Sequence, residues 1–61
     1  MTGQRLTRDV IRAAAWDAGN RSARAAGRSA WNEDDYNAGV AEQDRLAAQV
    51  PLATLESWGW A

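Results

Sequence analysis

The sequence predicts an all-α protein, either a small three-helix arrangement or a helical hairpin with a Trp-rich C-terminal tail packed on it. Apolar residues recur at helical spacing, and Thr, Asn, Gly and a single Pro stand where helices would begin and end. A chain of 61 residues has room for one small domain with a marginal core. We therefore assign residues 1–50 to a single helical domain and residues 51–61 to a Leu/Trp-rich C-terminal segment.

The first helix is expected over about residues 7–18, and a second over 21–29. Thr7 can cap the first helix, and Gly19 and Asn20 both tolerate the left-handed conformation that ends helices. Arg residues form two triads with the same spacing, Arg5, Arg8, Arg12 and Arg21, Arg24, Arg28. On one straight helix the second triad would lie about 160° from the first, over the face that the first helix buries. The pattern favours a break at Gly19, with a single bent helix as the alternative.

The third helix is expected over residues 33–50. Asn32 can cap it, Asp35 can return the bond, and three consecutive acidic residues complement the positive end of the helix. Pro51 prevents its continuation.

Large aromatic side chains are expected to provide the bulk of the core. Ala-rich helices lack bulk of their own, so Trp16, Trp31 and Tyr36 are the predicted core anchors. Trp58 and Trp60 have two open roles: they cover the same core, or they form an exposed anchor for another protein.

The C-terminal segment is predicted to contain a further helical turn. A turn over residues 52–57 would align Leu52 with Leu55, and Gly59 would then let the last two Trp residues fold back.

The charges divide between the two halves of the chain. Residues 1–31 carry six Arg and two Asp, whereas residues 32–61 carry six acidic residues and one Arg. The halves can pair within one chain or, in a two-fold dimer, between two copies, and we expect a homodimer. If the acidic helix neutralises the first triad, then Arg21, Arg24 and Arg28 are left free for a partner.

The residue inventory argues against an enzyme. The chain has no His and no Cys, and it has no Gly-rich phosphate loop, so we expect no catalytic residue, no cofactor and no metal. No apolar run approaches the length of a membrane span, so no membrane association is expected. The expected location is the cytoplasm, which is the host cytoplasm if a phage encodes the chain.

Nucleic-acid binding is the less favoured alternative. Ala15, Gly19 and Ala25 match the offsets of a helix-turn-helix, and the second Arg triad would suit phosphates. The acidic pI of about 5.1 and the acidic third helix weaken that attraction.

Residues 16–21 and 26–36 resemble small uncharacterised helical proteins of actinobacteria and their phages. The resemblance carries over no site residue, and it implies binding to a host or phage macromolecule.

These observations predict a noncatalytic protein-interaction module of the kind that acts as a small phage-type inhibitor or regulator. A small DNA-binding regulator and a structural assembly subunit are the alternatives. The predicted partner-binding residues are Arg21, Arg24, Arg28, Trp58 and Trp60.

Overall fold

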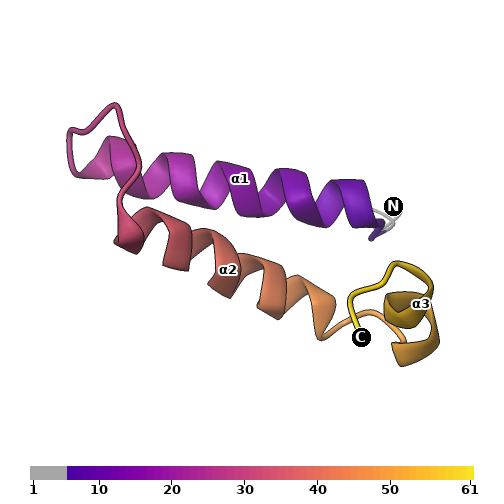
Figure 1. The fold of residues 1–61 in the computed structure, drawn as a ribbon. Coiled ribbons are helices and arrows are strands. Elements are labelled where there is room, and N and C mark those ends of the chain that lie inside the picture. The colour runs from indigo at the N-terminus through magenta and orange to yellow at the C-terminus, as the bar shows by residue number, and fades with distance from the viewer. Residues whose placement is uncertain (1–5) are drawn as a thin grey trace.

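The computed structural model describes residues 6–61, which form a helical hairpin followed by a short third helix. Helices α1 (Arg8–Ala25) and α2 (Glu33–Ala47) run antiparallel, and α3 (Leu52–Ser57) lies beyond the open end of the hairpin (Figure 1). The all-α prediction is confirmed, and α1 and α2 pack against each other as a hairpin. Arg5, the first member of the first Arg triad, lies outside the described residues.

Helix α1 is one continuous helix of 18 residues. Thr7 caps it as predicted, since the Val10 amide donates to Thr7 Oγ1 at 3.2 Å. The predicted break at Gly19 and the separate helix over residues 21–29 are wrong. Gly19 is buried beneath the indole of Trp31, so the missing side chain serves close packing and does not end the helix.

Helix α1 ends at a different glycine. Gly27 has φ 74°, and the Arg28 amide donates to the Ala23 carbonyl at 2.9 Å. The Gly27 amide donates to the Arg24 carbonyl at 3.0 Å, which completes a Schellman motif. The chain then turns through residues 26–32 into α2.

Helix α2 begins where the sequence predicts. Asn32 Oδ1 accepts from the Asp35 amide at 3.3 Å, and Asp35 Oδ2 accepts from the Asn32 amide at 2.8 Å, so both halves of a capping box are present. The helix was predicted to continue to residue 50, but it ends at Ala47. Residues 48–50 form a turn before Pro51.

The C-terminal segment folds on itself. Helix α3 covers the predicted turn, and Gly59 at φ 80° lets the Trp60 amide donate to the Leu55 carbonyl at 3.0 Å. The rings of Trp58 and Trp60 meet edge to face, with centroids 5.3 Å apart. Within the described residues, α1 and α2 are the helices that pack extensively against each other, so the tail adds little to the hairpin's own packing.

The hairpin is one helix layer thick. With α3 included, the principal extents of the molecule are 38 × 30 × 14 Å, and the smallest is close to the diameter of a single helix, about 10–12 Å. Ile11 and Ala23 are its buried apolar side chains within the described residues. At Gly39 the helices approach so closely that a Cβ would lie 3.0 Å from the Ala15 carbonyl oxygen.

No helix within residues 6–61 combines the length and the apolar character that crossing a membrane requires.

Candidate functional site

A buried carboxylate fixes the connection between α1 and α2. The Asp35 side chain is fully buried and accepts hydrogen bonds from both terminal nitrogens of Arg28, with Nη2 at 3.1 Å. It also accepts from Ser22 Oγ at 2.7 Å, in addition to the capping bond from the Asn32 amide. Arg28 Nη1 donates further to the Ala30 carbonyl at 3.3 Å. One side chain therefore ties the end of α1, the loop and the start of α2 together.

This cluster has the chemistry of a structural site. Hydrogen bonds from Arg28 hold the pKa of Asp35 well below its usual range, against the opposing effect of burial, and bonds from Ser22 and Asn32 act in the same direction. The same contact raises the pKa of Arg28. A carboxylate with so low a pKa and so many donors is a poor proton acceptor.

The loop also holds an indole against α1. Trp31 Nε1 donates to Asn20 Oδ1 at 2.9 Å, while its ring lies over Gly19. The Trp31 ring packs on Trp16, with centroids 5.0 Å apart and ring planes tilted by 33°. Two aromatic rings are therefore fixed side by side on one face of the hairpin.

These rings line an open groove of about 560 Å³ between the two helices. The lining residues are Arg12, Ala13, Ala15, Trp16, Trp31, Tyr36, Gly39, Val40 and Gln43. The large apolar side chains in it are exposed: Trp16 by 64%, Tyr36 by 62%, Val40 by 40% and Trp31 by 36%. We call this surface the aromatic groove.

The aromatic groove corrects the predicted core. The predicted core anchors Trp16, Trp31 and Tyr36 are all exposed. The prediction rested on the lack of bulky side chains in Ala-rich helices. In the structure no element within the described residues packs extensively over the α1–α2 layer, so that face stays open.

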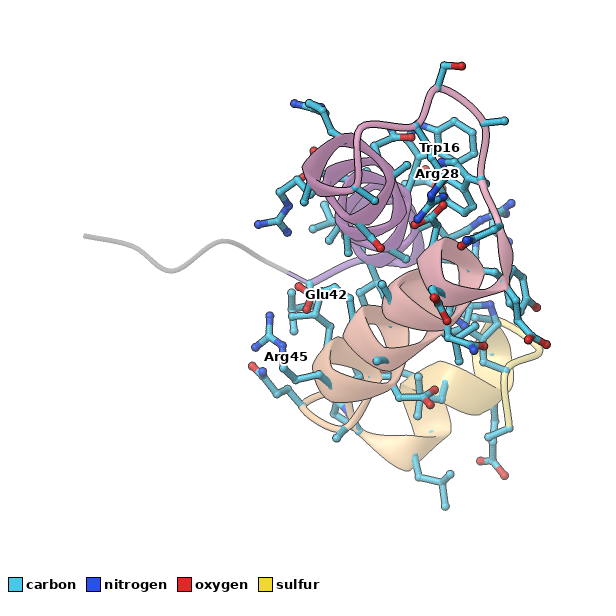
Figure 2. All side chains as sticks on the ribbon, turned by 90° about the vertical axis from the view of Figure 1, so that its left-hand side faces the viewer. Trp16, Arg28, Glu42 and Arg45 are labelled. Atoms are coloured by element: carbon cyan, nitrogen blue, oxygen red, sulfur yellow. The ribbon has the colours of Figure 1, made fainter. Side chains whose placement is uncertain are left out.

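The opposite face of the hairpin is charged. Arg45 Nε and Nη2 donate to the two carboxylate oxygens of Glu42 at 3.0 and 2.7 Å, and this contact lowers the pKa of Glu42. Figure 2, which looks along the hairpin from its loop end, shows Trp16 on one side and Glu42 with Arg45 on the other. The hairpin thus has one aromatic face and one face that carries ion pairs.

The predicted partner-binding Arg residues do not form one free basic face. Arg28 is held in the Asp35 cluster, and Arg21 Nε lies 3.1 Å from Asp17 Oδ2. Arg24 is exposed and makes no ion pair among residues 6–61.

The two predicted Trp anchors lie at the other end of the molecule. Trp58 and Trp60 are half-buried in the tail at the open end of the hairpin, away from the loop that holds Arg28 (Figure 1). The structure therefore does not bring the predicted partner-binding Arg residues and the two C-terminal Trp residues together.

The sequence did contain a signal for the aromatic groove. Arg12 and Trp16 are four residues apart in α1, and Tyr36 and Val40 are four apart in α2, so each pair lies on one helical face. That spacing does not say whether the face is covered.

The offsets that matched a helix-turn-helix do not form one. Ala15, Gly19 and Ala25 all lie within the uninterrupted α1, and no turn separates them.

No known protein family, curated protein or solved structure matches the chain. Among residues 6–61, no group of three or more acidic residues is clustered so that it could hold a metal ion. The aromatic groove is therefore the candidate functional site.

Proposed function

We propose that the chain is a noncatalytic helical protein-interaction module and that it binds its partner through the aromatic groove. One observation carries the proposal: two large aromatic side chains of the same groove, Trp16 on α1 and Tyr36 on α2, are each more than 60% exposed. The molecule that carries them is only 14 Å thick. A domain normally buries such a face against a second layer. Exposed apolar patches of this kind mark interaction sites.

The composition of the groove suits a helical partner. Ala13, Ala15 and Gly39 provide small side chains between the two helices, which allows another helix to approach closely. Trp16 and Tyr36 are of the residue types that dominate binding energy at interfaces, and Arg12 supplies a positive charge at the same surface. This arrangement favours a helix with an apolar face and an acidic residue placed to meet Arg12.

The noncatalytic part of the proposal rests on the available side chains. The chain contains no His and no Cys. Its fully buried acid, Asp35, is hydrogen-bonded on both oxygens. Neither feature provides a general base or a nucleophile.

Site-specific photo-crosslinking tests the proposal. A photoreactive phenylalanine analogue replaces Tyr36 in the groove, Arg45 on the charged face, or Trp58 in the tail. We expect a protein adduct from position 36 in a lysate of the native host, and none from position 45, because position 36 lies in an uncovered apolar groove and position 45 lies on the charged face.

A matched variant makes the assay specific. Trp16→Ala in the position 36 chain should remove most of the adduct while far-UV circular dichroism stays unchanged, because Trp16 is largely exposed. Equal adducts from positions 36 and 45 would overturn the proposed surface. An adduct from position 58 alone would assign binding to the tail, as the sequence-based prediction for Trp58 and Trp60 allows.

A further inference from the structure

We propose that the occupant of the aromatic groove is a second copy of this chain, and that the two hairpins form a two-fold four-helix bundle with both connecting loops at the same end. This inference rests on the proposed function, because it identifies the partner at the same surface. It specifies which helices face each other and which side chains meet.

The thickness of the molecule indicates what is missing. A single layer of two helices can bury side chains only between the helices, and here that space holds Ile11, Ala23 and Asp35 as buried side chains. Two such layers placed face to face make a four-helix bundle, in which both grooves are covered at once. A heterologous helix would cover the groove as well, but it would leave the charge pattern of this chain unexplained.

That charge pattern is self-complementary. Helix α1 carries four Arg and two Asp, and α2 carries five acidic residues and one Arg, but Asp35 is buried and Glu42 is paired with Arg45 on the opposite face. At the groove the relevant charges are Arg12, which lines it, and Asp44, one helical turn beyond Val40. A two-fold axis parallel to the helices sets each α1 over the α2 of the other copy, so that Arg12 of one copy faces the helix that carries Asp44 in the other. A two-fold axis across the helices would set α1 on α1 and α2 on α2, which brings like charges together. The parallel axis is therefore favoured, and it places both loops at one end.

The register within one hairpin identifies the contacts. Ser22 meets Asp35 near the loop, and Ala15 faces Gly39 further along, so Trp16 lies near the level of Val40. Arg12, one turn further from the loop, lies near the level of Gln43, which shares its groove.

A rotation about an axis parallel to the helices preserves these levels. Trp16 would then meet Val40 of the second copy, and Arg12 would meet Asp44 of the second copy, which follows Gln43 on the outer edge of the groove.

The two proposed ion-pair partners are available. Neither Arg12 nor Asp44 makes an ion pair or a side-chain hydrogen bond within residues 6–61, and both are exposed. Both can therefore be replaced without breaking an ion pair or a side-chain hydrogen bond among residues 6–61.

The available area is sufficient. A stable interface buries about 800 Å² on each partner, which is about a fifth of the 4452 Å² that one chain exposes.

A charge-swap experiment on the full chain tests the inference. Sedimentation equilibrium should give a dimer, and Arg12→Asp or Asp44→Arg alone should raise its dissociation constant about tenfold, because each change acts at two symmetric contacts. The double variant R12D/D44R should return to within about threefold of wild type. Arg24→Asp, a change to an exposed Arg on α1 outside the groove, should alter the constant less than about threefold.

A distance measurement tests whether the two loops lie at the same end of the bundle. A spin label on Ser29→Cys in the loop should give a distance below about 20 Å between the two copies, whereas loops at opposite ends would lie more than about 25 Å apart, the length of α1.

Each remaining outcome overturns a stated part. A chain that sediments as a monomer at about 100 μM overturns the second copy, as does an R12D/D44R chain that stays weaker than either single variant. A position 36 adduct whose mass shows another protein would then leave the proposed function standing. If no adduct and no dimer form, both fail.

Discussion

At the scale of single residues, the Asp35 cluster shows why a charged side chain is fully buried where the two helices of so small a protein join. Burial disfavours the carboxylate, but Arg28, Ser22 and Asn32 all donate to it, and their combined effect lowers its pKa. Removing one partner from such a cluster is costly, since the remaining groups stay buried and unpaired. Asp35 therefore specifies how the two helices join.

We expect Asp35→Asn to destabilise the hairpin more at pH 7 than at pH 3. The pKa of Asp35 is lower in the folded protein than in the unfolded chain, so its stabilising contribution is complete above the unfolded value of about 4 and is lost as the pH falls below it. Urea denaturation of both proteins at the two pH values measures the difference. Glu56→Gln removes an acid that makes no ion pair among residues 6–61. Its effect on the free energy of unfolding should be the same at pH 7 and pH 3. A wild-type to D35N difference that is independent of pH would contradict this assignment.

At the scale of elements, the sequence predicted what depends on neighbours a few residues away. The caps at Thr7 and Asn32 and the turn of α3 are confirmed because each uses hydrogen bonds within one helical turn. The helix end was predicted at Gly19, whereas it lies at Gly27. Gly19 is needed because Trp31, from the distant loop, lies on it, and no local pattern reports such a contact.

The cap of α2 gives a matched pair of variants. Asn32→Ala removes the acceptor for the first amides of α2 and should cost about 0.5–2 kcal/mol in the free energy of unfolding. Asn37 is exposed inside the same helix, where Ala is the better helix former. Asn37→Ala should therefore raise the free energy of unfolding by up to about 0.5 kcal/mol. Urea denaturation at pH 7 compares them. Effects of equal sign would show that the cap does not hold α2.

At the scale of the whole molecule, the predicted core failed because helical periodicity identifies a face without identifying its neighbour. The aromatic stripe of Trp16 and Tyr36 satisfies the pattern of a buried face, yet it is the outer surface of a single layer. The sequence could therefore predict a helical hairpin, and only the arrangement of its helices could locate the aromatic groove.

Truncation after Val50 should leave the hairpin folded. The helices α1 and α2 pack on each other, while α3 folds largely on itself. The shortened chain should therefore keep the helical circular dichroism signal that α1 and α2 contribute. It should melt within about 5 °C of the full chain. It should also sediment as the same oligomer. A shortened chain that loses its helical signal would show that the tail covers the hairpin, the other role considered for Trp58 and Trp60.

The contact between Trp16 and Trp31 has a spectroscopic consequence. Indoles held 5.0 Å apart at a fixed tilt couple their electronic transitions, so the near-ultraviolet ellipticity of this chain should carry a signal of their mutual orientation. Trp31 is attached to the loop and Trp16 to α1, so the signal reports whether the loop is closed on the helix. The molecule thus contains an optical probe of its own loop, with Trp31→Phe as the blank that isolates it.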